Sequence, residues 1–444
     1  MTTLRRRLGL AAVMAIVMGD MLGSGIFFTP GELAQVAEHP WQVYFIWSLA
    51  GLIVLCGALT LGELASLFPR AGATYHIMSE AFGPAWGFVK VWMEAWVSAP
   101  GSIAGIAIVF GEFVVSFLGE SAGPAPIWGI IAIVVFAGIN LMGVEWGGRA
   151  QIVLTTIKIT GLLVLVGGSY LLAEAVAPSG EVSSSGGGLP ALLRFVGLGV
   201  AAVFFTYDGW TDVTHVAGEV ANPKKTLPLG LGLGVSAIIV LYLVVNHAFL
   251  RVMPLAVMRD EGATVATRLA AATFGDAAGQ AVSAFIMISI FGALGGLVMT
   301  APRIIYAPAS QYKDSVRGGS VFRVLAYLTP KTRVPAGAIL FSATLSVFAI
   351  LFFQTFDRLV SFILVPLQLI NVATVAAVFR LRKRALQNPD QYLTPGYPVV
   401  PLVFIVVMTL LMVNAAVYNP LDTFTGVALT ALGLPVYLWI ARGT

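Results

Sequence analysis

The stretch GDMLGSGIFF, residues 19–28, lies inside the first long apolar run of the chain and carries two features that are unusual in a membrane-length helix. Gly23, Ser24 and Gly25 form a glycine–serine–glycine sequence, and Asp20 places a carboxylate just before it. Glycine is a poor helix former, and lipid cannot satisfy the backbone groups that an unwound helix exposes. The stretch therefore predicts a helix that is broken beside a polar cavity or a ligand.

The composition around this stretch is that of a membrane protein. The 444 residues are 58% hydrophobic and 10% charged, whereas soluble domains average about 25% charged residues. The net charge of +4 comes from basic residues in short loops, so it indicates membrane topology and no nucleic-acid partner. The single cysteine, Cys56, lies in an apolar run and cannot form an internal disulfide. We expect no metal site and no cofactor.

Runs of about 20 apolar residues, the length that crosses a bilayer, predict an all-α polytopic protein with twelve transmembrane helices. Most lysines and arginines fall in segments on one side, so both termini are predicted to be cytoplasmic in a multi-pass protein of the inner (cell) membrane. The first run follows three arginines but is interpreted as a retained span, because many more spans follow it. The predicted spans are 8–29, 43–63, 87–117, 127–144, 150–173, 192–216, 229–250, 280–306, 336–353, 359–379, 399–418 and 424–441.

A second break is predicted in the sixth span, where the sequence TYDGW occupies residues 206–210. Each break lies in the first helix of a block of five spans. The pattern predicts inverted repeats at residues 8–173 and 192–379, followed by two helices at 399–441, as in transporters whose broken helices meet at the membrane midplane. The alternative for the glycines of the first break is close helix packing.

Four motifs in the expected order resemble one known family. GSGIFFTPGELA resembles the first-helix motif of the amino acid–polyamine–organocation (APC) superfamily. LGELASLFPRAGATY, VWMEAWVSAPGSIA and FFTYDGWTDVTHVAGEVANPKKTLPLG resemble the second-helix loop, the third helix and the sixth helix of its bacterial L-type amino acid transporter (LAT) branch. The resemblance implies a LeuT-type fold of five plus five inverted helices, with helices 1 and 6 unwound, and transport of amino acids.

The resemblance also implies how the two breaks bind a substrate. A half-helix N-terminus favours an anion and a half-helix C-terminus favours a cation, so two breaks can hold a zwitterion. The resemblance implies that the substrate carboxylate binds the backbone amides around Gly23, Ser24 and Gly25. We hypothesise that the Ser24 hydroxyl donates a further hydrogen bond to this carboxylate. The resemblance also implies that the substrate ammonium binds backbone carbonyls near Met21 and Phe205. Phe205 matches the aromatic residue that closes over the substrate in this family.

Further pocket residues are expected on the third and sixth helices. The resemblance places Ser102 and Ile106 against the substrate, and Thr206 and Thr211 with Ser102 favour small or medium neutral side chains. Asp208 has two interpretations: partial selection for the ammonium or side chain of the substrate, or capping of a half-helix that begins at Gly209.

Three charged residues are candidates for coupling or gating. Lys158 is a lysine in mid-span, which is costly and marks a functional-site candidate. The family places a lysine there where sodium-coupled relatives hold a cation, which implies that sodium is not needed. Asp20 departs from the family pattern, and we hypothesise a buried pair with Lys158 or a carboxylate that exchanges protons. Glu219 matches the loop motif and is interpreted as a structural or inner-gate carboxylate.

The sequence therefore predicts a sodium-independent, alternating-access secondary active transporter of neutral L-amino acids that works as an exchanger. A proton-coupled symporter is the alternative, and a transport-dead amino acid sensor is a third. An enzyme is not expected, because the four histidines are widely spaced and no catalytic motif is present. The predicted partners are the amino acid substrate and the lipid bilayer, in a monomer or weak homodimer. The animal branch often pairs with a heavy chain through a loop cysteine, but Cys56 lies in a span, so no disulfide-linked heavy chain is expected.

Overall fold

The computed structural model describes residues 8–442, except for positions 24, 71, 143–158, 177–188, 315–318 and 333. The helices, turns and loops within those residues fall into two compact units. Unit 1 contains Met1–Gly83, Leu162–Val282 and Gln368–Asn414, and unit 2 contains Pro84–Gly161, Ser283–Leu367 and Ala415–Thr444. Each unit draws on both predicted repeats, and the division at residues 8–173 and 192–379 stays a prediction.

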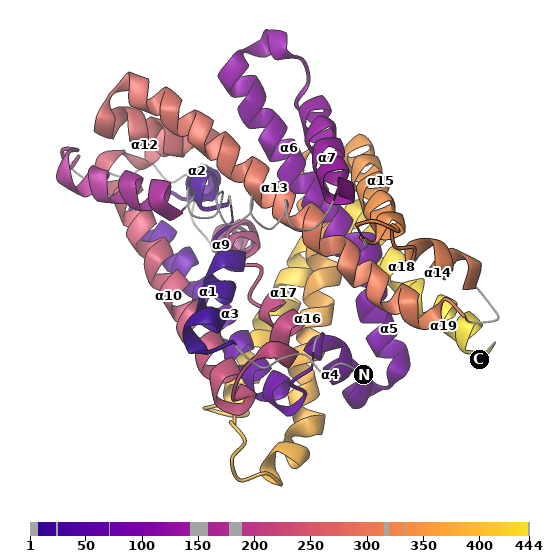
Figure 1. Ribbon diagram of the computed structural model, residues 1–444. Coiled ribbons are helices and arrows are strands. Elements are labelled where there is room, and N and C mark those ends of the chain that lie inside the picture. Colours follow the sequence, from indigo (N-terminus) through magenta and orange to yellow (C-terminus); the bar gives the residue numbers. More distant parts are fainter. Residues whose placement is uncertain are drawn as a thin grey trace. The chain divides into compact units, whose positions relative to one another are not determined.

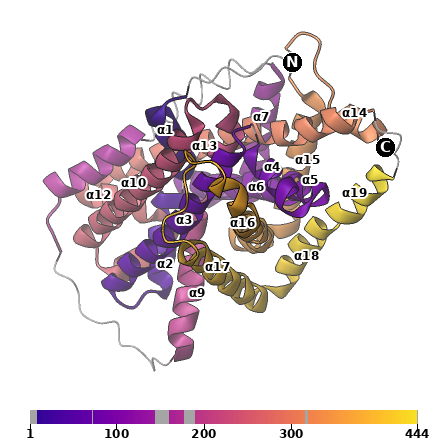
Figure 2. The same ribbon diagram turned by 90° about the horizontal axis from the view of Figure 1, so that it is seen from below.

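Unit 1 is built around α10 (Pro223–Val252), which packs against α3 (Pro40–Leu67) and α1 (Leu10–Met21). The three helices lie side by side in both views (Figure 1 and Figure 2). α9 (Leu189–Thr206) packs against α3 and against α2 (Thr29–Val36). Small residues bring α10 close to α1. A Cβ added at Gly230 would lie 2.3 Å from Cγ1 of Val13, and one added at Gly234 would lie 2.9 Å from Cγ1 of Val17.

Shorter helices complete the described part of unit 1. Two of them, α11 (Leu255–Glu261) and α12 (Val265–Phe274), lie between the predicted spans 229–250 and 280–306, and α4 (Ala73–Phe82) begins within the second-helix loop motif. Their sequences are too short or too polar to be recognised as spans, so the hydropathy pattern predicted only loops there.

Unit 2 has α6 (Ala99–Leu118) packed against α7 (Ala125–Met142), with α15 (Ala336–Phe353) packed on both (Figure 1). A π-helical turn, Glu94–Ser98, joins α5 (Pro84–Met93) to α6. Pro100 follows this turn, and because proline removes a backbone donor and crowds the preceding turn, the wider π turn accommodates it. A local change of helix type therefore accompanies Pro100. The remaining helices of unit 2 are α14 (Gly319–Leu325), α18 (Pro420–Ala431) and α19 (Gly433–Ala441).

Three long helices contribute to the membrane-spanning part of the chain together with those above. They are α13 (Asp276–Tyr312), α16 (Phe356–Leu386) and α17 (Val399–Tyr418). Nine helices in the described residues are long and apolar enough to cross a membrane, and each matches a predicted span. The other three predicted spans coincide with the shorter helices Leu10–Met21, Ile159–Leu171 and Leu189–Thr206. The protein is an all-α, multi-pass membrane protein, and the count of twelve crossings stays a prediction.

Candidate functional site

The first break lies where the sequence predicts it. α1 ends at Met21, and the Leu22 amide donates to the Met18 carbonyl at 2.8 Å. The Gly23 amide then turns back to the Met21 carbonyl at 2.7 Å, which closes a three-residue turn. A short 3-10 helix, Gly25–Phe27, precedes α2. The glycines therefore mark a true interruption of the helix.

The second break begins where α9 ends at Thr206. The backbone turns at residues 207–211, and a 3-10 helix, Asp212–Glu219, follows. Gly209 has φ +98°, a conformation that glycine adopts at low cost. No helix begins at Gly209, so the capping interpretation of Asp208 is wrong. The next helical segment begins at Asp212, and its N-cap residue, Thr211, forms no side-chain cap hydrogen bond.

The two breaks are in direct backbone contact within unit 1. A Cβ added at Gly209 would lie 2.7 Å from the Asp20 carbonyl oxygen. A Cβ added at Gly25 would lie 2.6 Å from Oγ1 of Thr206. Both distances are shorter than side chains tolerate, so glycine at these positions allows one break to rest on the other.

A tyrosine of α10 joins the ends of the two broken helices. The Tyr242 hydroxyl lies 2.7 Å from the Met21 carbonyl oxygen and 3.1 Å from the Thr206 carbonyl oxygen, and both are hydrogen bonds. The hydroxyls of Thr206 and Thr29 add a buried bond at 2.8 Å between α9 and the start of α2. These bonds satisfy backbone and side-chain groups that an apolar surrounding would leave unpaired.

Aromatic rings form the support behind these bonds. Tyr242 contacts Trp47 and Tyr207 edge to face, with ring centroids 5.1 Å apart in each pair. All three side chains are fully buried. The Tyr207 hydroxyl donates to the Trp47 carbonyl at 3.1 Å, so buried tyrosine hydroxyls here find partners as expected. The cluster fixes the direction in which the Tyr242 hydroxyl points.

The predicted binding residues of unit 1 lie at these breaks, where their backbone is already partly engaged. The Met21 carbonyl accepts from both the Gly23 amide and the Tyr242 hydroxyl. The Thr211 hydroxyl lies 3.5 Å from Oδ1 of Asp212. Met21, Gly25 and Thr206 are buried, whereas the half-buried residues are Gly23, Phe205, Asp208 and Thr211.

Other predicted residues lie elsewhere or outside the described part of the chain. Ser102 and Ile106 are half-buried on α6 of unit 2, and their approach to the breaks stays a prediction. Ser24 and Lys158 fall outside the described residues, and so does the side chain of Glu219. The proposed pairing of Asp20 with Lys158 is therefore untested. No group of histidine, cysteine or acidic residues that could hold a metal ion is present among the described residues.

A separate polar cluster lies at the far end of α3. The fully buried Glu63 carboxylate forms an ion pair with Arg382 of α16. Its Oε2 atom also accepts the Thr394 amide at 2.6 Å and the Thr394 hydroxyl at 2.7 Å. Burial and the Glu63 charge raise the pKa of the nearby Tyr392 to about 12. The cluster ties the loop before α17 to α3.

Sequence reasoning missed Tyr242 and the partnership of Thr29 with Thr206. Tyr242 stands in the apolar run IIVLYLVV, where hydropathy counts it with its neighbours. The available signal was chemical, because a tyrosine in mid-span needs a hydrogen-bond partner for its hydroxyl. Its partners are backbone carbonyls, and the sequence does not encode their position.

The chain matches known transporters over most of its length. The amino acid permease family model matches residues 8–440. The serine/threonine exchanger SteT of Bacillus subtilis (strain 168) is 28% identical over 435 residues, covering 98% of this chain and 96% of that protein. The b(0,+)-type amino acid transporter 1 of Homo sapiens is 27% identical, covering 93% and 82%, and the cystine/glutamate transporter of Homo sapiens is 26% identical, covering 98% and 85%. The chain therefore belongs to the amino acid permease family of the APC superfamily, a family of membrane transporters and not of enzymes.

Proposed function

We propose that this permease exchanges neutral L-amino acids across the inner (cell) membrane by alternating access and without sodium, with both termini in the cytoplasm. The observation that carries the proposal is the joining of both helix breaks by the Tyr242 hydroxyl, which creates one site from two sets of helix ends. Exchange is supported by the serine/threonine exchanger, which is similar along 98% of this chain.

The substrate's charged groups would use opposite ends of the broken helices. The carboxylate would bind amides of the Gly23–Gly25 turn, at the positive end of the following helical segments. The ammonium would bind carbonyls at the ends of α1 and α9, near Met21 and Phe205. Because the Met21 carbonyl already accepts two bonds, we expect the ammonium to share or replace one of them.

Coupling depends on the charges beside the first break. Lys158 would occupy the place of a coupling cation, so transport would not respond to sodium. Asp20 precedes the same break, and a carboxylate there that exchanges protons would convert exchange into proton symport. The two mechanisms differ in their dependence on internal substrate and on the pH gradient.

The proposal is tested by reconstitution. Purified protein in proteoliposomes would take up members of a labelled amino acid panel, with and without internal amino acid, and across imposed sodium and pH gradients. We expect uptake of small or medium neutral L-amino acids that requires internal substrate and ignores sodium.

Each outcome separates the alternatives. Uptake into empty vesicles that follows the pH gradient, and loses this dependence in Asp20→Asn, would replace exchange by proton symport. Binding of amino acids without uptake under any condition would identify a sensor. Uptake driven by a sodium gradient would contradict the role given to Lys158.

A further inference from the structure

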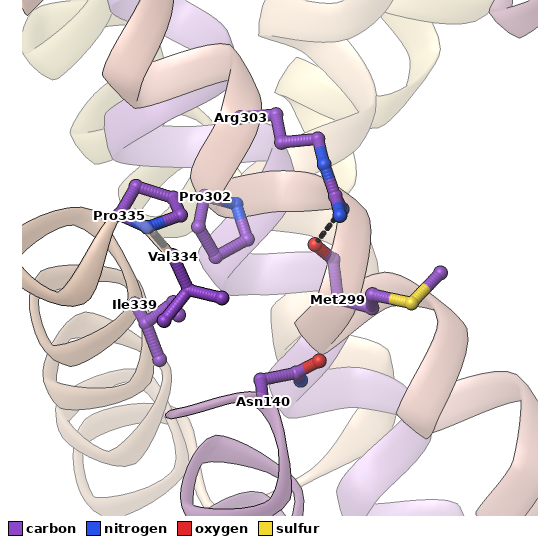
Figure 3. A pocket seen from close by; sticks show the side chains of 7 residues that line it. All are labelled: Asn140, Met299, Pro302, Arg303, Val334, Pro335 and Ile339. Atoms are coloured by element: carbon purple, nitrogen blue, oxygen red, sulfur yellow. Dashed lines mark hydrogen bonds between the residues drawn. The ribbon is translucent and has the colours of Figure 1, made fainter. Parts of the chain in front are cut away.

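Unit 2 contains a pocket that the proposed transport site does not use. It is an open hollow, whose roughly 220 Å³ of empty space includes open solvent, and it lies between the end of α7, the side of α13 and the start of α15. Figure 3 shows the Arg303 side chain above and the Asn140 amide below, with Met299 between them and the apolar side chains of Pro302, Val334 and Ile339 to one side. The pocket suits a small charged group with a short apolar attachment.

Arg303 is the cation of this pocket and lies within the apolar span Gly279–Tyr306. Its guanidinium donates to the Met299 carbonyl of its own helix at 2.5 Å. No carboxylate pairs with it among the described residues. A guanidinium has five N–H donors, so most remain available for an anion, and a phosphate accepts two of them in a bidentate arrangement.

The opposite end of the pocket offers a second donor. Asn140 is 95% buried at the end of α7, and its Nδ2 atom donates one hydrogen to the Phe136 carbonyl at 3.0 Å. No partner for the second N–H of this amide is found among the described residues, so it can donate to an anion in the pocket. A charged donor and a neutral donor therefore face the same space.

The segment beside the pocket has the character of a membrane interface. α14 packs against α15, and Val321, Val324 and Tyr327 on or next to α14 are more than half exposed. Exposed basic residues, Arg323 and Lys331, accompany them. Apolar and aromatic side chains mixed with basic ones are typical of a segment that lies in the headgroup region of a bilayer.

Hydrogen bonds join this interfacial segment to the wall of the pocket. The Thr329 amide donates to the Val334 carbonyl at 3.0 Å, and the Val334 amide donates to the Thr329 hydroxyl at 3.1 Å. The Thr332 hydroxyl lies 3.4 Å from the Leu141 carbonyl at the end of α7. The segment that follows α14 is thus bonded directly to the wall of the pocket.

We propose that this pocket binds the phosphate of an anionic phospholipid from the adjacent leaflet. Arg303 binds the phosphate, Asn140 contributes a further hydrogen bond, and the apolar wall holds the first carbons of the lipid. The basic surface beside it attracts anionic lipid, because juxtamembrane lysines and arginines favour negatively charged leaflets. The site is separate from the helix breaks of unit 1 and does not depend on the transport proposal.

The test measures lipid retention by the purified full chain in detergent, using native mass spectrometry. Phosphatidylglycerol and phosphatidylcholine with identical acyl chains would be titrated in parallel, with and without excess inorganic phosphate. We expect wild-type protein to retain one phosphatidylglycerol with at least about tenfold preference over phosphatidylcholine, since charge-assisted bonds are the strong ones. Arg303→Gln should lose that preference, and Arg303→Lys should keep part of it.

The control is Arg268→Gln, because Arg268 is an exposed arginine in unit 1 whose contact with Glu261 is long, at 3.8 Å. It should bind lipid as wild type does. If Arg303→Gln does not fold, Asn140→Asp keeps Arg303 and places a competing carboxylate in the pocket, and it should also abolish the preference. Unchanged phosphatidylglycerol binding in the variants, equal binding of both lipids, or occupation of the site by inorganic phosphate alone would overturn the proposal.

Discussion

Replacing Tyr242 by phenylalanine removes the one group that bonds to both helix breaks and leaves the rest of the ring in place. The ring contacts with Trp47 and Tyr207 need no hydroxyl, so the packing should be retained. What is lost is the donor to the Met21 carbonyl at 2.7 Å and to the Thr206 carbonyl at 3.1 Å. The change therefore isolates the connection between the breaks.

The size of the effect follows from the hydrogen-bond geometry. A hydroxyl has one proton, so the two bonds share it, and the shorter bond to Met21 takes most of the interaction. Leaving a buried carbonyl without its donor costs about 1–3 kcal/mol. Part of this is recovered because the Met21 carbonyl keeps the Gly23 amide as a donor. We expect a loss of about 1–2 kcal/mol, which corresponds to roughly a 5- to 30-fold change in an equilibrium constant.

The assay compares Tyr242→Phe with Tyr207→Phe in the same proteoliposomes. Tyr207 is equally buried, but within the described residues its hydroxyl bonds only the Trp47 carbonyl of α3. Both variants should lose thermal stability in detergent. Tyr242→Phe should weaken the apparent affinity for the amino acid more than Tyr207→Phe does, because the Tyr242 hydroxyl bonds carbonyls at the ends of both broken helices, whereas the Tyr207 hydroxyl bonds α3. Affinity would be measured from concentration-dependent uptake and from substrate-induced thermal stabilisation.

Two results would refute this reasoning. If Tyr242→Phe keeps wild-type affinity while its stability falls as much as that of Tyr207→Phe, the hydroxyl is only a structural contact. If both variants lose affinity equally, the aromatic cluster as a whole acts on the site, and the bond to the breaks has no special part.

Three further predictions concern the breaks and the polar clusters. Gly209→Ala should weaken uptake, because a left-handed φ costs about 1–2 kcal/mol for a residue with a Cβ and because the added atom would clash with the Asp20 carbonyl. Gly19→Ala is the control: the space around Gly19 is open, so uptake in parallel assays should be unchanged. Glu63→Ala should lower the thermal stability in detergent by an amount equivalent to about 3–5 kcal/mol, because it leaves Arg382 without its buried partner; unchanged stability would mean that this ion pair contributes little. Burial, followed by the Arg70 charge, lowers the pKa of His76, so the unfolded chain binds more protons than the folded one. The thermal stability should therefore fall as the pH drops below about 6.5, and it should depend less steeply on pH in His76→Asn.

The membrane-spanning helices were predictable because their signal is local. Hydropathy located all nine of the long apolar helices among the described residues, with ends displaced by a few residues. α10 begins six residues before its predicted span, at Pro223, because proline fits the first turn of a helix that extends beyond the apolar run. α11 and α12 were not predicted, because both are too short to be recognised as membrane spans from hydropathy.

The site was predictable in position but only partly in composition. Glycine and aspartate in mid-span indicated both breaks, since their helix propensity is low whatever surrounds them. The sequence could not show that Gly209 rests on Asp20, or that the Thr206 and Thr29 hydroxyls meet. Those contacts join residues about 180 positions apart, and they depend on how α9 packs beside the first break.

The position of Tyr242 has a consequence for how the permease can move. α10 follows α1 in parallel, with Gly230 against Val13 and Gly234 against Val17, and Tyr242 then reaches the end of α1. The same hydroxyl holds the end of α9, so a movement that separates the two breaks would have to break at least one of these two buried bonds. Because lipid offers no replacement partner for the freed carbonyls, we expect the two breaks to move together during alternating access. A substrate held by both would then keep its backbone contacts through the cycle, and access would change around it.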